Sequence, residues 1–244
     1  MLLLSPLLSI GFVSVLSFPL AAGAAPSVLA GWTFEAVTGL PVNVTNYGPL
    51  ASDVGSGDLT SYHRNGGGFS APVGNGSSLS LSSSAWVLDD YYQFKTSSKG
   101  YQDLVLKWDH TSSASGPADF SLRYSLDGIA YSDINSYKVS NVTWSSTSAS
   151  AASSRIVNLS AIPNLNDQSS VYLRLQMNGT SRADGQTGSV SFTNGTSRID
   201  NVFIEAEKIT TSAVPGPLPA LGVVAAFGTA RRLRRRVRLM APSA

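Results

Sequence analysis

The stretch that decides the fold is "SVYLRLQM", residues 170–177, in which apolar and polar side chains alternate. One parity holds Val171, Leu173, Leu175 and Met177, and the other holds Tyr172, Arg174 and Gln176. Successive side chains of a β-strand point to opposite faces of the sheet. The alternation therefore predicts a strand with one buried and one solvated face, which is typical of an antiparallel sheet.

The same alternation recurs along the chain, in "GWTFEA" (31–36), "YYQFKT" (91–96), "DLVLKWDH" (103–110), "DFSLRYSLDG" (119–128) and "RIDNVFIEAE" (198–207). The positions expected in the core are Trp32, Phe34, Leu104, Leu106, Leu122, Leu173, Leu175, Val202 and Ile204.

Turn residues separate these runs. Asp127-Gly128 suits a tight hairpin, and Gly/Ser/Asn-rich stretches at 55–57, 65–68 and 74–78 read as loops. The Ser-rich run 145–154 is either a loop or a polar edge. Many short strands joined by such turns predict an all-β fold, an antiparallel β-sandwich or jelly roll spanning 26–210.

Composition excludes several classes of function. The chain has 244 residues and no cysteine, so disulfides, thiolate metal sites and a cysteine nucleophile are excluded. Six of its 17 basic residues are arginines within 231–238, which leaves 11 against 15 acidic residues, a net charge of −4, for the remainder. An acidic body argues against a nucleic-acid partner, because such proteins neutralise phosphates with basic side chains.

The N-terminus predicts export. Residues 2–20 are mainly apolar, and the small residues Ala21-Ala22-Gly23-Ala24-Ala25 follow them. This order predicts a signal peptide over 1–25, although no Lys or Arg precedes Arg64. The alternatives are an uncleaved hydrophobic anchor and a buried segment.

The C-terminus, 211–244, has three parts: "VPGPLP" at 214–219, a mostly apolar stretch at 218–230, and the arginine cluster at 231–238. The apolar stretch is shorter than the ~20 residues that usually cross a bilayer, but arginine stems extend its reach. We expect a short transmembrane helix whose basic end stays in the cytoplasm.

This tail resembles the PEP-CTERM sorting signal, with Gly216 where the name-giving motif has Glu. The resemblance implies processing by an exosortase-type membrane protease and a place in the cell envelope, at the cell surface or in an exopolysaccharide-rich matrix. A plain tail anchor is the alternative. The residues that carry the resemblance are Val214, Pro215, Gly216, Pro217, Arg231, Arg232, Arg234, Arg235 and Arg236.

The body also resembles a family. "VNLSAIPNLNDQSSVYLRL" (157–175), "SRIDNVFIEA" (197–206) and "FSLRYSLDG" (120–128) are similar to jelly-roll domains of bacterial exported proteins. The resemblance implies that the first and last strands lie side by side and that the shape is like that of carbohydrate-binding domains. It also implies a structural calcium ion near those strands, with Glu35 and Asp200 as ligands. Otherwise Glu35 is exposed and Asp200 hydrogen-bonds the backbone.

No catalytic motif is present: the chain lacks a G-x-S-x-G elbow, an H-E-x-x-H helix and a P-loop. We expect His110, at a strand end, to be either packed or at the solvent edge, His63 to lie in a loop, and Asp89-Asp90 to lie in a solvated loop. The sequence therefore predicts a protein that is not an enzyme and needs no cofactor other than the calcium ion.

Aromatic side chains are the remaining candidates for contact with sugars: Trp86, Tyr91, Tyr101, Tyr131, Tyr137 and Trp144. The alternative is that these residues belong to the core.

Three hypotheses follow. The first is an exported, exosortase-sorted matrix or envelope protein with a non-catalytic body, the second a lectin-like carbohydrate-binding module, and the third a glycan-active hydrolase. Exposed aromatics clustered on one sheet would favour the second. A deep pocket with converging carboxylates would favour the third, and a featureless sandwich would leave the first.

Overall fold

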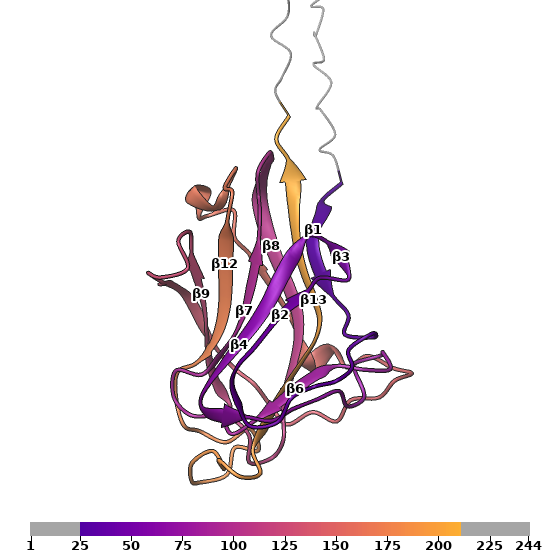
Figure 1. Ribbon diagram of the computed structural model, residues 1–244, viewed down its shortest axis with the longest axis vertical. Coiled ribbons are helices and arrows are strands. Elements are labelled where there is room, and N and C mark those ends of the chain that lie inside the picture. The colour runs from indigo at the N-terminus through magenta and orange to yellow at the C-terminus, as the bar shows by residue number, and fades with distance from the viewer. Residues whose placement is uncertain (1–24, 211–244) are drawn as a thin grey trace, which may run out of the picture. The chain divides into compact units, whose positions relative to one another are not determined.

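The computed structural model describes residues 25–210, which form a sandwich of two antiparallel sheets (Figure 1). Sheet A has the order β11-β8-β13-β1-β3, and β6 pairs with β13 and with β5. Its strands are β1 (Ser27–Trp32), β3 (Val54–Gly55), β5 (Phe69–Ser70), β6 (Leu81–Ser84), β8 (Tyr101–Ser112), β11 (Ser154–Asn158) and β13 (Thr196–Lys208).

Sheet B has the order β10-β9-β12-β7-β4-β2. Its strands are β2 (Val44–Ala51), β4 (Gly57–Gly67), β7 (Tyr91–Thr96), β9 (Asp119–Ser125), β10 (Ser132–Lys138) and β12 (Val171–Met177). Two short 3₁₀ turns, η1 (Ala151–Ser153) and η2 (Pro163–Leu165), are the helical elements of the described residues.

The stretch quoted first forms β12, which pairs with β9 on one side and β7 on the other. Leu173 and Leu175 are fully buried, whereas Tyr172 and Arg174 are half-exposed. All nine residues predicted for the core are buried, and they pack in one cluster between the sheets. The all-β sandwich predicted from alternation is therefore confirmed.

The first and last strands pair as expected, with Trp32 opposite Val202 and Ala30 opposite Ile204. However, β1 ends at Trp32, and Phe34 lies beyond it with a φ of 61°. Phe34 still reaches the core, so its burial comes from a turn and not from strand alternation.

A bulge at Asn201 shifts the phase of β13. The register changes between Asp200 and Phe203, and Asn201 has a φ of 47°. An extra residue in one strand leaves its two sides out of phase. Ile199 and Val202 are therefore both buried, although strict alternation would place them on opposite faces.

Two local predictions are wrong. His63 lies within β4 and is fully buried, because the glycines after it belong to the same strand and not to a loop. Asp90 is also fully buried, while its neighbour Asp89 is exposed.

The turn at Asp127-Gly128 lies in a loop, residues 126–131, that joins β9 to β10. The Ser-rich run 145–154 supplies a loop, η1 and the first residue of the edge strand β11.

The predicted signal peptide (residues 1–25, described only at residue 25) and the predicted sorting tail with its nine motif residues lie outside the described residues. Within residues 25–210, the structure has no helix of the length and apolarity needed to span a membrane.

Candidate ligand-binding face

The outward face of sheet B gathers aromatic and planar polar side chains. Strand registers align them in cross-strand rows: Tyr62 opposite Tyr91 and then Gln176, and Thr60 opposite Gln93, Arg174 and then Arg123. Their neighbours on the same strands point inward, so the alternation that builds the core also builds this face.

A stacked row crosses the middle of this face. The rings of Tyr62 and Tyr91 stack with centroids 5.5 Å apart. The Arg174 guanidinium carbon lies 3.7 Å from the Tyr91 ring centroid and 3.6 Å from that of Tyr131. Arg174 is therefore held between two aromatic rings, an arrangement stabilised by cation–π attraction. We call Tyr62, Tyr91, Arg174 and Tyr131 the stacked row.

Gln93 holds two members of the stacked row, Arg174 and Tyr131, by hydrogen bonds. Its Oε1 accepts hydrogen bonds from Arg174 Nε at 3.2 Å and Nη2 at 2.7 Å, and also from the Tyr131 hydroxyl. Arg123 Nη2 donates to the backbone carbonyl of Tyr131, which anchors the loop that carries this ring. Partial burial raises the pKa of the Tyr131 phenol and lowers the pKa of Arg174 from its ordinary value. At neutral pH the phenol is neutral and the guanidinium is charged.

Charges on this face are unevenly paired. Arg123 Nε lies 2.7 Å from Asp133 Oδ1, and Arg64 Nη2 lies 3.5 Å from Asp89 Oδ2. Among the described residues, neither Arg174 nor Lys95 forms an ion pair. Lys95 instead lies over the ring of Tyr172, with its Nζ 5.6 Å from the centroid.

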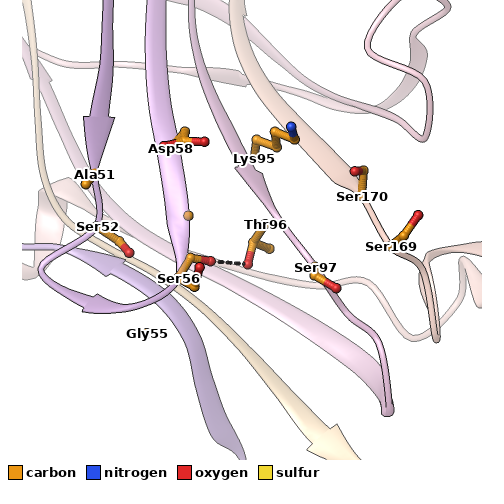
Figure 2. Close-up of a pocket in the computed structure, with 11 residues that line it drawn as sticks. Ala51, Ser52, Gly55, Ser56, Asp58, Lys95, Thr96, Ser97, Ser169 and Ser170 are labelled. Carbon is orange, nitrogen blue, oxygen red and sulfur yellow. Dashed lines mark hydrogen bonds between the residues drawn. The ribbon is translucent and has the colours of Figure 1, made fainter.

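Open hollows flank the stacked row. One of about 310 Å³ lies beside Gln176 and is lined by Asp89, Ser121, Arg123, Asp133, Asn135, Ser136, Gln176 and Asn178. Another, of about 400 Å³, lies at the ends of β4, β7 and β12 and is rich in hydroxyl groups (Figure 2). Lys95 and Asp58 border it from the outward face, and Thr96 Oγ1 is held by the Ser56 carbonyl at 2.8 Å.

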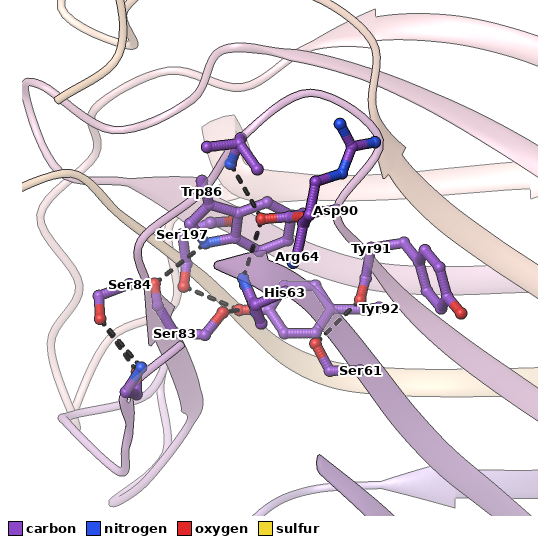
Figure 3. A network of polar contacts seen from close by, with 12 residues as sticks. Ser61, His63, Arg64, Ser83, Ser84, Trp86, Asp90, Tyr91, Tyr92 and Ser197 are labelled. Atoms are coloured by element: carbon purple, nitrogen blue, oxygen red, sulfur yellow. Dashed lines mark hydrogen bonds and ion pairs between the residues drawn. The ribbon is translucent and has the colours of Figure 1, made fainter. Parts of the chain in front are cut away.

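Beneath the face lies an enclosed polar network (Figure 3). His63 Nδ1 is 3.3 Å from Asp90 Oδ2, and both side chains have no exposed area. The contact lacks hydrogen-bond geometry, and Asp90 is held by the backbone N–H groups of Arg64 and Val87. The His63 ring packs against Phe69 and Trp86. A His–Asp pair can act as a general base, but this one is sealed from substrate and is structural.

His110 is packed in the core, which is the first of the two alternatives that the sequence left open. Its Nδ1 lies 3.1 Å from the Tyr137 hydroxyl and its Nε2 lies 2.7 Å from Ser197 Oγ. Burial, aided by the charge of Arg155, lowers the pKa of His110 from 6.5 to about 3. The ring is therefore neutral at physiological pH.

The residues predicted to bind calcium both hold one loop, residues 74–79. Asp200 is fully buried and accepts hydrogen bonds from the backbone of Asn75 and Asn201, each at 2.8 Å, and from Ser77 Oγ. Exposed Glu35 accepts one from the backbone N–H of Leu79 at 2.9 Å. Burial raises the pKa of Asp200 to about 6, and nearby Asp109 adds to this.

Both Asp200 oxygens thus already have protein donors. Within residues 25–210, no group of three or more His, Cys, Asp or Glu side chains could hold a metal ion. A calcium ion at Glu35 and Asp200 stays a prediction.

The structure divides the aromatic candidates. Tyr91 and Tyr131 belong to the stacked row, whereas Trp86 and Trp144 are buried. Tyr101 begins β8 of sheet A, and the ring of Tyr137 packs against Trp108 and His110. Sequence reasoning missed Tyr62, Gln93, Lys95, Tyr172 and Arg174. For Gln93, Lys95, Tyr172 and Arg174 the signal was present in the outward parity of the predicted strands β7 and β12, whereas Tyr62 lies on β4, which the sequence did not predict as a strand.

No protein-family model matches this chain, and no curated protein matches its sequence. Solved structures are similar in fold. One is the CBM22-1–GH10 part of xylanase 10B from Clostridium thermocellum, in complex with xylohexaose, at 14% identity and a TM-score of 0.40. The match covers 78% of this chain but spans only 30% of that one.

A second is TmCBM61 in complex with beta-1,4-galactotriose, at 11% identity and a TM-score of 0.32, covering 62% of this chain and 88% of that one. A third is a cleaved adhesin domain of Lys-gingipain from Porphyromonas gingivalis, at 10% identity and a TM-score of 0.39, covering 74% and 98%. At these identities the likeness concerns the fold alone.

Proposed function

We propose that this chain is an exported, surface-displayed protein whose β-sandwich binds carbohydrate on the outward face of sheet B. The observation that carries the proposal is the stacked row: two tyrosines and an arginine on neighbouring strands, joined by Tyr131 from the loop 126–131. Aromatics clustered on one sheet support a binding module over a featureless sandwich, although these tyrosines are half-exposed and the condition stated for the sequence was exposed aromatics.

The geometry of the row suits a polymer rich in hydroxyl groups. Neighbouring strands are about 4.8 Å apart, so rings that stack across strands stand up from the sheet and present their edges to solvent. The ligand therefore meets phenol hydroxyls and guanidinium N–H groups. Groups already fixed by stacking lose little entropy on binding, which favours affinity. The open hollows on either side leave room for a chain that extends past the row.

The same face supports binding more than hydrolysis. A glycoside hydrolase needs two carboxyl groups that converge on one bond, one of them in an environment that raises its pKa. On this face Asp133 and Asp89 are exposed and paired with arginines, and Asp58 is exposed at the edge of the other hollow. The proposal is therefore a non-catalytic carbohydrate-binding protein.

The proposal that the protein is exported and held at the cell surface is based on the two ends of the sequence. In this proposal the signal peptide exports the chain, the apolar stretch 218–230 holds it at the membrane, and the arginines at 231–238 stay in the cytoplasm. An exosortase-type protease then cuts near 214–219, and the sandwich is left facing the polysaccharide of the envelope or matrix.

Binding is tested with the full chain, purified in mild detergent, against a panel of immobilised neutral and acidic polysaccharides. Tyr91→Ala removes the ring between Tyr62 and Arg174, and we expect it to weaken binding by about tenfold or more, a loss of about 1.4 kcal/mol. Tyr101→Ala, a half-exposed tyrosine of sheet A, is the matched control and should leave the affinity unchanged. Failure of the native chain to bind any polysaccharide would refute the proposal.

Display is tested separately, with an epitope tag inserted after Ser148 in the exposed loop before η1. Replacing Arg231, Arg232, Arg234, Arg235 and Arg236 with Ser should release or mislocalise the unprocessed chain, as followed by fractionation and immunoblot. If the variant is processed and located like the native protein, the sorting role of the tail is wrong.

A further inference from the structure

Arg174 differs from the other arginines of the outward face of sheet B in lacking a counter-charge. Arg123 has Asp133, and Arg64 has Asp89, as ion-pair partners. Arg174 is half-buried, contacts two rings and a neutral amide, and pairs with no carboxylate among the described residues. A nearby charge that acts on it is that of Arg123, another cation.

One edge of the guanidinium stays open. Tyr91 and Tyr131 cover its two faces, and Gln93 takes the Nε–Nη2 edge. No described residue hydrogen-bonds to Nη1. The Nη1–Nη2 edge is one of the forks with which arginine binds a planar anion through two parallel hydrogen bonds.

A second unpaired cation lies close by. Lys95 is on β7, opposite Tyr172, while Arg174 is opposite Gln93. Arg174 and Lys95 are therefore diagonal neighbours on one face, about 7–8 Å apart at the backbone. Asp58 is opposite Lys95 on β4, but the two form no ion pair. Arg174 and Lys95 together carry two positive charges against the one negative charge of Asp58, which leaves an excess positive charge beside the stacked row.

We infer that the carbohydrate bound by this face is an acidic polysaccharide, whose anionic group, a carboxylate or a sulfate ester, pairs with the open edge of Arg174 while Lys95 contacts a neighbouring part of the chain. This inference rests on the proposed carbohydrate-binding function and names its ligand class. Apart from the arginine cluster at 231–238, the acidic body offers no long-range attraction to such a polymer, so recognition by this face depends on these short-range contacts.

The test compares polymers that differ only in charge. The full chain is titrated with polygalacturonate, alginate and carrageenan, and with the carboxyl-reduced or desulfated form of each, and the dissociation constants are compared. We expect at least one native polymer to bind about tenfold or more tightly than its neutralised form. The carboxylate and sulfate arms identify which anion is preferred.

Two substitutions of Arg174 test whether the anionic group of the polymer pairs with this residue. Arg174→Gln should abolish most of the preference for the charged polymer, measured as the ratio of the dissociation constants of the neutralised and charged forms. Arg174→Lys, which keeps the charge but loses the fork, should retain only part of the preference. Lys107→Gln, an exposed cation on the outward face of sheet A, is the matched control and should change nothing. Melting curves verify that each variant is folded.

The outcomes separate the two proposals. Binding of equal strength to charged and neutralised polymers overturns the acidic ligand but keeps carbohydrate binding. A preference for charge that survives Arg174→Gln overturns the assignment of the anion to Arg174. No binding to any polymer of the panel overturns the proposed function and this inference with it.

Discussion

The outward faces of the two sheets obey the same alternation rule and carry opposite chemistry. On sheet A, Phe203 covers Gly31, where an added Cβ would lie 2.6 Å from its ring, and Lys107 pairs with Glu205 at 2.7 Å. On sheet B, tyrosines and a guanidinium stand in a stacked row, and two cations have no carboxylate partner among the described residues.

The difference separates the inward residues that stabilise the sandwich from the outward residues that could bind a ligand. The inward positions of both sheets hold the same kinds of large apolar side chains and form one core. On the outward side of sheet A, Lys107 and Glu205 pair with each other, and Arg198 donates to the backbone carbonyl of Val73. The outward positions of sheet B leave hydrogen-bonding edges and positive charge unused, which is what a ligand-binding surface requires.

The sharpest test of this division uses neighbours on β12. Leu173 is fully buried, so Leu173→Ala should lower the free energy of unfolding by about 2–5 kcal/mol and leave the affinity of the folded protein for polysaccharide unchanged. Arg174→Gln loses two cation–π contacts and should cost less than about 2 kcal/mol, yet weaken binding. Denaturant unfolding and binding titrations measure both. Equal losses of affinity in the two variants would break the division.

The pH dependence of stability should come from the buried His110 on β8 of sheet A and not from the outward face of sheet B. The folded pKa of His110 is about 3 and its ordinary value is 6.5, so the unfolded chain takes up the proton first as the pH falls. Stability should therefore drop below pH 6.5 by about 1.4 kcal/mol per pH unit, until the folded pKa is reached. Asp200, with a raised pKa of about 6, offsets part of this loss between pH 6 and 3.8.

Comparison with His110→Gln isolates the histidine, because Asp200 is present in both proteins. The difference in unfolding free energy between native chain and variant should shrink by about 2 kcal/mol from pH 6.5 to pH 5. Over pH 6–8 the affinity for polysaccharide should stay constant, because phenol groups are ordinarily neutral and guanidinium groups charged throughout this range. A pH-independent difference in stability would contradict the burial of a neutral His110.

The effect of calcium is predicted to be the smallest, and it too belongs to the sheet A side. An ion held by Glu35 and Asp200 in the folded chain alone would raise the melting temperature by mass action as Ca²⁺ is titrated into chelator-treated protein. Glu35→Gln should abolish that rise. The absence of any shift at millimolar Ca²⁺ would remove the ion from this account.

The sequence predicted the core well because burial follows local alternation, which is visible within each strand. It failed where a single residue breaks the phase, as at the bulge of Asn201, and where glycines continue a strand, as after His63. The outward parity of Tyr172 and Arg174 could be read directly. Their partners could not, because Tyr91 meets Arg174 through cross-strand register and Tyr131 reaches it from a loop.

The central claim is that the ligand lies on the outward face of sheet B. It is tested most directly by mapping backbone and side-chain NMR shifts of the isotope-labelled protein as a bound polysaccharide fragment is added. We predict that the largest changes occur at Tyr62, Tyr91, Gln93, Arg174 and at the loop carrying Tyr131, and that Val105, Lys107 and Phe203 stay unchanged. Changes centred on the outward face of sheet A, or spread evenly over both faces, would contradict the account.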